Sequence, residues 1–490
     1  MVAIITDKIK QFFAESLYDE LVGTKLGDSD NYFYLAVGRS QQWQPATNED
    51  NAPDPANTER EERLFRYSMQ SVKAVESFSY VVPLKDWTAN TEYSAFNDNV
   101  AGQPSTSYYV RTADNNVYLC IRTGKNALGA TQVSTVKPSH TSLALPILSD
   151  GYIWKYMYTI STADANKFLS TEFMPLKYVD SASSLDPYFG QYTVQNAAIP
   201  GQIIGYRVVE KGGIYTSAPA ITVVGDGRNA RARAILNSTG GIEAVEVDDS
   251  DGAGNPTSNG STPAGYPFGT GYNQANVVVS SSSLSVGGTA AQVVPIFAPA
   301  GGLGANAIKD LRSTSIMFNV KPESTVDGTW LVDNDYRQVG LLKNIEDYNS
   351  PGTKFTDTSG IAMWRMQLTS SPGDGDPATG YAINFGNSNR IVGGDSDAVA
   401  WLDYYNDSNE LWYHQDEYTG FTRFRNGEEV TIRNATGTGL SYSGSTLTIA
   451  DAEIVPDINR YSGDLIFVNN FATVTRDRGQ TEDIKLVIKL

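Results

Sequence analysis

The chain has 490 residues, with 37 lysine and arginine side chains against 55 aspartate and glutamate side chains, and therefore a formal net charge of −18. That length exceeds one ordinary hydrophobic core, so we expect two to four domains. A surface with this charge repels phosphate, which argues against nucleic acid or an anionic membrane as a partner. No run approaches the roughly eighteen consecutive apolar residues of a membrane span, so we also expect no membrane insertion.

Two helices are expected near the start of the chain. Asp7 suits the N-cap of a helix that ends near Leu21, because apolar residues recur between them at helical spacing. A second helix is predicted from residue 57 or 58 to near Phe78. The segment between them, residues 46–57, is rich in Asn, Pro and Asp and is predicted to be a loop.

From Val81 onward the chain consists of short β-type runs separated by Gly, Asn, Asp, Ser and Pro. The 28 tyrosines and 44 glycines fit such a fold, since aromatic residues fill strand faces and glycines form turns. The predicted fold class is mainly β with a few N-terminal helices: an α+β scaffold that carries inserted sandwich-like or barrel-like domains. The single cysteine, Cys120, lies in an apolar run and is predicted to be a buried thiol.

A shift in composition near Ile199 marks the first inserted domain, residues 200–310, which is rich in Gly, Ser, Ala and Val. Within it, residues 212–224 correspond loosely to residues 269–279, and each segment is followed by a glycine-bearing turn and an Ala-rich strand. We therefore expect two stacked β units whose small side chains let strands pack closely. A long polar loop is predicted at residues 248–267.

The second inserted domain, residues 349–454, is denser in aromatic residues and ends in a hairpin pattern. We interpret it as a small β-barrel or sandwich. Its aromatic side chains form either a sugar-stacking platform or part of the domain's core, and we favour the core. The candidate glycan-stacking residues are Trp401, Tyr404, Tyr405, Trp412 and Tyr413.

The sequence offers little for catalysis or metal binding. Its two histidines, His140 and His414, lack the spacing to other ligands that a zinc site requires, and surface hydrogen bonding is their expected role. Acidic turns at 248–252, 374–376 and 395–397 are interpreted as solvated, with a calcium site in an inserted domain as the alternative. We predict no enzymatic activity, no cofactor and no metal site.

Two strand-to-loop junctions are the most informative local features. In Gly38–Trp43 and in Val82–Trp87, an apolar run ends in a charged turn that is followed by a tryptophan. Further segments follow in order at residues 117–121, 150–158, 336–342, 462–470 and 480–488. This ordered set resembles the baseplate wedge protein family, the product of gene eight, of T-even-like contractile-tailed bacteriophages.

The resemblance implies a structural subunit of a contractile-tail baseplate wedge that acts in tail assembly by protein–protein contacts and rearranges on host contact. It also implies a homodimer, other baseplate wedge proteins as partners, and a place in the tail baseplate of the virion after synthesis in the host bacterial cytoplasm. Exposed aromatic and basic side chains make good interface anchors. The candidate interface residues are Arg39, Trp43, Lys85 and Trp87.

The resemblance covers about half of the chain, so the predicted scaffold is discontinuous. It comprises an N-terminal part at residues 1–195, a return at 311–348 and a C-terminal hairpin at 455–490. The role of the two inserted domains does not carry over from the family. The alternative function is therefore a tail-surface adhesin or glycan-binding protein that uses the inserted β domains, and a glycan-degrading enzyme ranks third.

Overall fold

The computed structural model describes residues 6–23, 31–43, 52–53, 59–98, 106–248, 268–322, 330, 334–369, 389–405, 409–433, 447–476 and 482–490. The fold is mainly β, with 45% strand and 12% helix, which confirms the predicted fold class. In this part of the chain no helix combines the length and the hydropathy of a membrane span.

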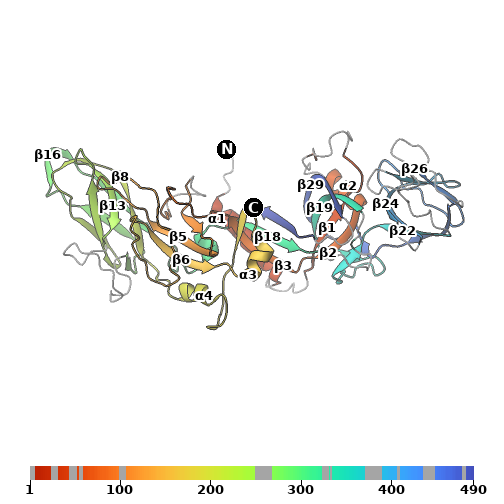
Figure 1. The fold of residues 1–490 in the computed structure, drawn as a ribbon, viewed down its shortest axis with the longest axis horizontal. Coiled ribbons are helices and arrows are strands. Elements are labelled where there is room, and N and C mark those ends of the chain that lie inside the picture. The colour runs from red at the N-terminus through yellow and green to blue at the C-terminus, as the bar shows by residue number, and fades with distance from the viewer. Residues whose placement is uncertain are drawn as a thin grey trace. The chain divides into compact units, whose positions relative to one another are not determined.

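The chain divides into two compact units, each assembled from separate stretches (Figure 1). Unit 1 comprises Met1–Ser16, Ser79–Met317 and Val487–Leu490, and unit 2 comprises Leu17–Phe78 and Phe318–Leu486. The chain passes between the units within α1 (Asp7–Val22), β3 (Ser77–Pro83), β18 (Ser315–Val320) and β30 (Ile484–Lys489). Helix α1 confirms the first predicted helix.

Unit 2 contains a five-stranded antiparallel sheet with the order β21-β2-β1-β19-β29 and a closed six-stranded barrel. Its elements are β1 (Phe33–Gly38), α2 (Glu59–Ser68), β2 (Met69–Ala74), β19 (Asn334–Lys343), β20 (Glu346–Asp347), β21 (Ser359–Ile361), β22 (Trp364–Leu368), β23 (Arg390–Gly393), β24 (Val399–Tyr405), β25 (Glu410–His414), β26 (Glu429–Arg433), β27 (Leu447–Ile454), β28 (Ile458–Asn459) and β29 (Asp464–Arg476).

The second predicted helix is too long. Helix α2 ends at Ser68 and the chain continues directly into β2, where Met69 and Val72 are fully buried against the sheet. Strand pairing between β2 and β1 outweighs the weak helical spacing of this segment. The predicted C-terminal hairpin is also wrong, because β29 pairs with β19 while β30 lies beside β18 in a different sheet.

Strand β19 lies between β1 and β29, and α2 packs on this part of the sheet. The phenyl ring of Phe65 on α2 is fully buried above Gly340 in the middle of β19. A Cβ atom at Gly340 would lie 2.5 Å from the ring carbon Cε1 of Phe65, closer than real Cβ contacts allow. The absence of a side chain at Gly340 therefore sets how closely α2 approaches the sheet.

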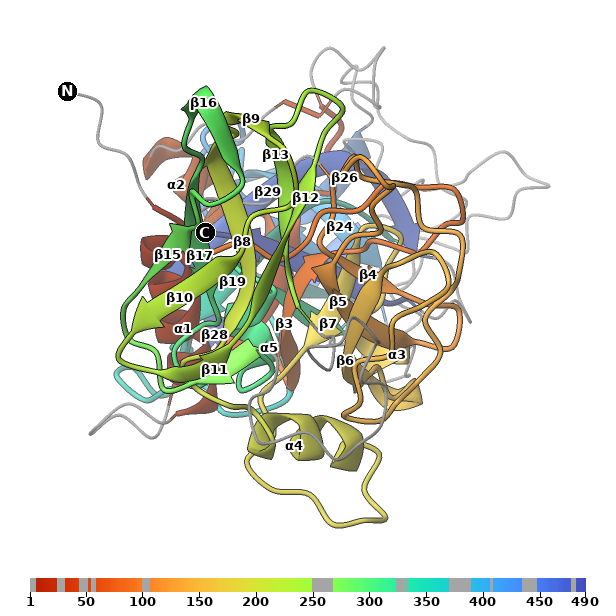
Figure 2. The ribbon, with the colours of Figure 1, turned by 90° about the vertical axis from the view of Figure 1, so that its left-hand side faces the viewer.

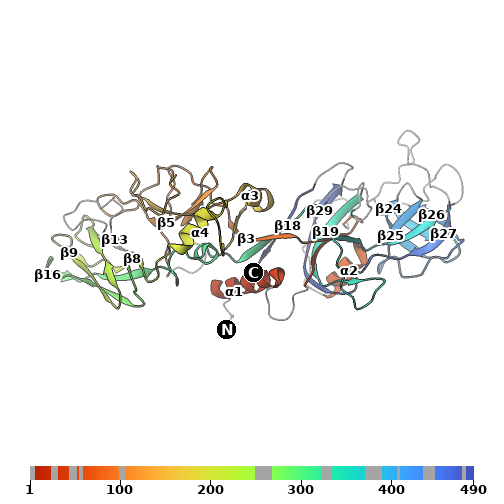
Figure 3. The same ribbon diagram turned by 90° about the horizontal axis from the view of Figure 1, so that it is seen from below.

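The barrel has the strand order β22-β25-β24-β23-β26-β27 (Figure 3). Its interior is filled by alternate residues of the strands, as the period of two requires. Strands β26 and β27 confirm the predicted hairpin pairing, and the segment between them lies outside the described residues. The barrel core consists of Met366, Leu368, Ile391, Ala398, Ala400, Leu402, Leu411, Tyr413, Phe424, Val430, Ile432, Leu447, Ile449 and Ala452.

Unit 1 begins with the three-stranded sheet β4-β5-β6, whose buried face carries Tyr118, Cys120, Tyr152 and Trp154. Cys120 is fully buried, as predicted, and burial raises the pKa of its thiol. The elements of this first part of unit 1 are β4 (Tyr109–Arg111), β5 (Asn116–Arg122), β6 (Ile153–Thr159), α3 (Thr162–Phe168), β7 (Phe173–Leu176) and α4 (Phe189–Asn196).

The Gly-, Ser- and Ala-rich region forms a module with ten strands in its described residues, 203–248 and 268–297 (Figure 2). They are β8 (Ile203–Glu210), β9 (Gly213–Tyr215), β10 (Ile221–Gly225), β11 (Arg228–Ala230), β12 (Ala232–Leu236), β13 (Ile242–Val247), β14 (Phe268–Thr270), β15 (Ala275–Val279), β16 (Leu284–Thr289) and β17 (Gln292–Phe297). Each of the first five strands pairs with one of the last five: β8 with β17, β9 with β16, β10 with β15, β11 with β14 and β12 with β13.

The two halves of this module are interleaved rather than stacked, contrary to the prediction. The two halves β8–β12 and β13–β17 are equivalent in order, so that β8 corresponds to β13 and β12 to β17. When each strand is replaced by its equivalent, every pair maps onto a pair that is also present. Strands β10 and β15 then pair across an approximate two-fold axis at Val223 and Val277, which are direct partners in the register. The equivalent tyrosines Tyr215 and Tyr272 are both buried. The sequence repeat was real, but it did not show which strands would pair.

A buried carboxyl group lies where unit 1 leaves the module. Asp310, the last residue of α5 (Ala307–Asp310), is 1% exposed and accepts a hydrogen bond of 2.7 Å from the backbone N–H of Gly304. Burial raises the pKa of Asp310 to about 7, although the Gly304 N–H and the charge of Lys155 act in the opposite direction. The neutral carboxyl is therefore favoured in the folded state.

Replacement of Gly340 by alanine tests the contact between α2 and the sheet. The backbone of Gly340 has no positive φ, so only the overlap with Phe65 matters, and we expect a loss of about 1–3 kcal/mol in the free energy of unfolding. Denaturant unfolding followed by circular dichroism measures it. As a control, Phe65→Leu combined with Gly340→Ala should lose less than the sum of the single changes; additive losses would contradict the overlap.

Asp310 should make stability fall as pH rises. Between pH 4 and 7 the unfolded carboxyl ionises while the folded one stays protonated, so ionisation favours unfolding. The free energy of unfolding of the variant Asp310→Asn, minus that of the native protein, should rise by about 2–3 kcal/mol from pH 5 to pH 8. Each unit of pKa shift corresponds to about 1.4 kcal/mol. Paired thermal denaturation at both pH values measures the difference. A stability difference between the variant and the native protein that is the same at both pH values would contradict the raised pKa of Asp310.

Candidate functional site

The first junction, residues 38–43, is held tightly within unit 2. Arg39 adopts a left-handed backbone with φ +63°, unusual for a residue with a side chain, and its N–H donates to the Ser68 carbonyl at 3.0 Å. Its guanidinium carbon lies 4.1 Å from the ring centroid of Trp43. The Trp43 indole N–H donates to the Phe471 carbonyl at 2.9 Å, and the side chain is 6% exposed. Trp43 therefore packs within its own chain and leaves little surface for a neighbouring subunit.

The next residues of the junction reach a buried Asp–His pair on the barrel. The Ser40 hydroxyl donates to Oδ1 of Asp403 at 2.5 Å, while Oδ2 of Asp403 lies 2.6 Å from Nδ1 of His414. The Gln41 amide contacts Nε2 of His414. Both Asp403 and His414 are completely buried. Because a carboxylate only accepts, Nδ1 carries a proton, and Nε2 faces the Gln41 amide.

This arrangement contains serine, histidine and aspartate but not in a catalytic order. In a hydrolase triad the histidine lies between the other two and takes the proton of the serine. Here Asp403 is the central group, and Nε2 of His414 is occupied by Gln41. The group instead forms charge-assisted hydrogen bonds that hold the 38–43 junction against β24 and β25. The expectation that His414 lies at the surface is wrong, because the junction covers it.

A buried arginine supports the same junction from the sheet. Arg337 on β19 is 1% exposed, contacts the Ser40 carbonyl through Nη1, and places Nη2 3.3 Å from Oδ2 of Asp335. Burial, and then the positive charge of Arg337, lower the pKa of Arg39. The junction, which itself carries Arg39, thus lies between a cation of the five-stranded sheet, Arg337, and an anion of the barrel, Asp403.

The second junction belongs to unit 1 and is more open. Lys85 is exposed, and Trp87 is partly buried against the sheet core, with its indole N–H 3.2 Å from the Ser134 hydroxyl. Arg111 holds the turn between them, because its Nε and Nη2 donate to the two carboxylate oxygens of Asp86 at 2.7 and 3.1 Å. Of the four candidate interface residues, Lys85 is exposed, Arg39 and Trp87 are partly buried, and Trp43 is buried.

The candidate glycan-stacking residues do not form one exposed platform. Tyr413 fills the barrel core, and Trp401 and Trp412 point out of the barrel but are only 7% and 3% exposed. Arginines cover them: the Cζ atoms of Arg390 and Arg365 lie 4.6 and 5.5 Å from the respective ring centroids. Tyr404 and Tyr405 are partly buried, with Tyr404 edge-on to Trp412 at 5.7 Å.

The acidic turn at residues 395–397 is organised by a third carboxylate, that of Glu428. Glu428 is 2% exposed and accepts hydrogen bonds from the N–H groups of Asp395, Ser396 and Arg425 and from the Ser396 hydroxyl, at 2.6–3.1 Å. Burial raises the pKa of Glu428, but these donors outweigh it and hold the pKa below its usual range.

The other acidic turns fall largely outside the described residues. Turn 374–376 and all of turn 248–252 except Asp248 lie outside the residues that the structure describes. Within the ranges that the structure describes, no three His, Cys, Asp or Glu side chains gather as a metal site would require. The remaining histidine, His140, lies 5.5 Å from the ring of Tyr118, and burial lowers the pKa of its imidazole.

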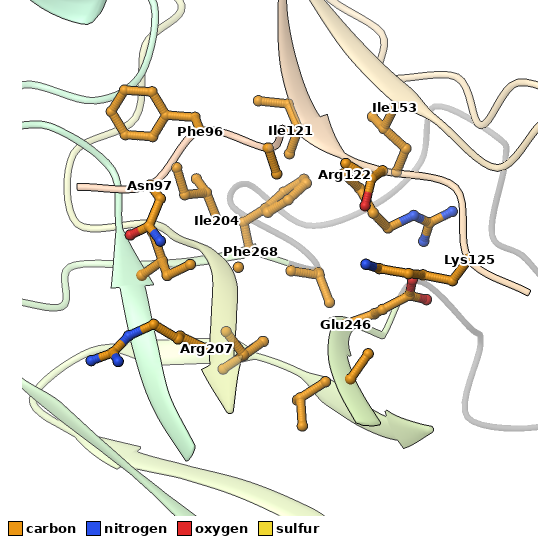
Figure 4. A pocket seen from close by; sticks show the side chains of 18 of the residues that line it. Phe96, Asn97, Ile121, Arg122, Lys125, Ile153, Ile204, Arg207, Glu246 and Phe268 are labelled. Atoms are coloured by element: carbon orange, nitrogen blue, oxygen red, sulfur yellow. The ribbon is translucent and has the colours of Figure 1, made fainter. Parts of the chain in front are cut away.

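Unit 1 also contains a cavity of about 970 Å³ between the β5–β6 edge and the module (Figure 4). Its walls are mainly apolar, with Ile121, Ile153, Ile204 and Phe268 among them. Several charged side chains at its edge have partners: Lys211 pairs with Glu243 at 2.6 Å, Glu246 with Arg233 at 2.9 Å, and Lys125 donates to Thr131 at 2.5 Å. The cavity therefore offers shape and apolar surface, but most of these charges are committed to the protein itself.

Sequence reasoning found the first junction but missed the pair that it contacts. Strand alternation could have placed Asp403 on the face of Trp401, and His414 on the face of Trp412. Their meeting depends on the register of β24 with β25, in which Trp401 pairs with His414 and a bulge follows Leu402. No local pattern predicts that bulge.

No model of a known protein family matches the sequence, and no curated protein is similar enough to it to count as a match.

Substitutions at Asp403 and Ser40 test the buried group. Asp403→Asn removes the acceptor of one buried bond, and we expect a loss of about 2–4 kcal/mol in the free energy of unfolding. Ser40→Ala should cost about 1–2 kcal/mol, and the double variant less than the sum, because both changes remove the same bond. Chemical denaturation measures all three.

The matched control is Asp397→Asn, an exposed aspartate of the same barrel with a left-handed backbone that asparagine tolerates. It should change stability by less than about 0.5 kcal/mol. Equal losses in the free energy of unfolding for Asp397→Asn and Asp403→Asn would show that the buried hydrogen bonds of Asp403 do not contribute to stability.

Proposed function

We propose that the chain is a structural subunit of a baseplate wedge in a contractile phage tail, and that it acts through assembly and rearrangement rather than through chemistry. The observation that carries the proposal is the ordered set of segments that resemble the wedge family. Three of them belong to neighbouring strands of one sheet: the 38–43 junction follows β1, residues 336–342 lie in β19, and residues 462–470 overlap β29.

The segments in unit 1 are similarly grouped. Residues 117–121 lie in β5 and residues 150–158 lead into β6, and these two strands are paired. Segments that are far apart in the sequence thus belong to common sheets, as parts of one inherited scaffold would. This grouping supports the resemblance without depending on any single motif.

A wedge subunit has to transmit force without deforming, and unit 2 has the features for this. The buried Ser40–Asp403–His414 group fixes the barrel to the five-stranded sheet through hydrogen bonds whose partners are all from the chain itself. Such satisfied buried networks favour a single arrangement. Rearrangement on host contact would then occur between subunits rather than within this unit.

An exposed aromatic group favours a glycan-binding tail adhesin as the second candidate. Phe421 and Tyr461 are 54% and 55% exposed, and their rings lie 5.3 and 6.0 Å from the ring of Tyr67. Aromatic faces of this kind can stack on sugars, but they also serve protein interfaces. Binding of the full chain to a glycan array, lost in Phe421→Ala with Tyr461→Ala, would favour the adhesin.

Electron microscopy of intact, uncontracted particles labelled with a gold-conjugated antibody against the chain tests the proposal. Label confined to the distal plate of the tail is the expected result. Label along fibres would favour the adhesin. Particles that carry no label, whether intact or disrupted, although the antibody binds the isolated protein, would overturn both.

A further inference from the structure

The cavity of unit 1 is larger than a packing defect. Protein interiors leave few voids bigger than a water molecule, whereas this cavity has a volume of about 970 Å³. Sites for small molecules have volumes of roughly 300–1,000 Å³. The cavity therefore has the size of a ligand site.

The walls of the cavity come from two parts of unit 1. Ile121 of β5 and Ile153 of β6 contribute from the three-stranded sheet, and Ile204 of β8 and Phe268 of β14 contribute from the module. The segment 143–147, which is apolar throughout, forms a further wall. A ligand in the cavity would therefore meet apolar carbon over most of its surface.

The charged side chains that line the cavity are mostly basic, although the whole chain is acidic. Among the described lining residues four are basic and two are acidic, in a chain with a formal net charge of −18. Both acidic groups are in ion pairs, Glu243 with Lys211 at 2.6 Å and Glu246 with Arg233 at 2.9 Å. The local excess of positive charge favours an anionic ligand over a neutral or cationic one.

Lys125 is the cation that lacks an acidic partner. Its amino group donates to the Thr131 hydroxyl at 2.5 Å, and this neutral oxygen takes one of its three N–H donors. No carboxylate in the described part of the chain forms an ion pair with it. Burial lowers the pKa of Lys125, and the negative charges of Glu246 and Glu92 offset this only in part. Figure 4 shows the amino group directed into the cavity, where a bound anion would compensate its charge.

We propose that the cavity binds a long-chain carboxylate, with the alkyl chain against the apolar walls and the carboxylate at Lys125. The site goes beyond the proposed function, which gives the ten-stranded module no role of its own. Apolar walls that supply affinity, with one charged group that fixes the orientation of the ligand, are the usual composition of such a site.

Isothermal titration calorimetry of the full-length protein with decanoate, below its critical micelle concentration, measures the binding. We expect one decanoate per chain. Each methylene removed, down to hexanoate, should weaken binding about fourfold, because the walls bury the alkyl chain. Acetate, which has the carboxylate without the chain, should not bind.

Analogues with other head groups test the requirement for an anion. 1-Decanol and decyltrimethylammonium have the same alkyl chain with a neutral and a positive head, and they should bind at least about tenfold more weakly than decanoate. The variant Lys125→Gln should bind decanoate about tenfold more weakly and decanol with unchanged affinity.

The matched control for Lys125 is Lys137→Gln. Lys137 is an exposed lysine of the same unit whose amino group pairs with Asp114 at 3.0 Å, outside the cavity. Its replacement removes the same charge and should leave decanoate binding within about twofold of the native value. Both variants should keep the circular dichroism spectrum of the native protein.

A pair of leucines tests the position of the alkyl chain. Leu143 lines the cavity and is 46% exposed, whereas Leu128 is 51% exposed and does not line it. Leu143→Gln should weaken the binding of decanoate and of decanol several-fold, because it removes apolar wall. Leu128→Gln should leave both affinities within about twofold of the native values.

A protein that binds none of these chains would overturn the inference, and so would one that binds decanol or decyltrimethylammonium as tightly as decanoate. Decanoate binding that Lys125→Gln and Leu143→Gln leave intact would lie elsewhere on the chain and would also overturn it. None of these results bears on the wedge proposal, which the labelling of particles tests separately.

Discussion

The antiparallel ladder between β1 and β19 is the interaction on which the rest of the structure depends. It joins Phe33 to Lys343 and Gly38 to Gln338, positions about 300 residues apart in the chain. Forming it closes a very long loop, whose entropy cost must be repaid by burial. Phe65 above Gly340 supplies part of that burial at the centre of β19. Most of unit 1 is an excursion of the chain between these two strands.

The buried polar group on the barrel has a different role from this apolar packing. Hydrophobic contacts tolerate small shifts, whereas a carboxylate with donors on both oxygens tolerates few. Ser40 and His414 each use one oxygen of Asp403, so the barrel has one favoured position on the sheet. Residues that would suggest a hydrolase from their types alone thus serve to position a domain. A catalytic triad and this positioning group differ in which residue lies in the middle. In the triad it is the histidine, and here it is Asp403.

Individual helices and strands, which depend on local residue patterns, were predictable from the sequence. The pairing of strands that are far apart in the chain was not. The 3.6-residue spacing of α1 and the alternation in the barrel strands identified elements and the fold class. The end of α2 at Ser68 was missed because β2 is stabilised by its partner β1, far outside any sequence window. The burial of His414 was missed, and that of Trp43 was left open as the alternative to an interface role, for the same reason, since each is covered by segments more than 350 residues away. Composition set apart the two regions that form the ten-stranded module and the barrel, but their internal pairing is a property of the folded chain.

The interleaved module shows what such pairing entails. Every named strand of β8–β12 takes its partner from β13–β17, so neither half holds a strand ladder of its own. Half of the module would leave five strands with open edges, while two identical halves could satisfy each other as separate chains. The module therefore has the strand pairing of a dimer whose two halves exchange every partner, contained within one polypeptide. The pairing is also nested, because β12 and β13 are consecutive and pair as a local hairpin, whereas β8 and β17, at the two ends of the module, pair across its full length.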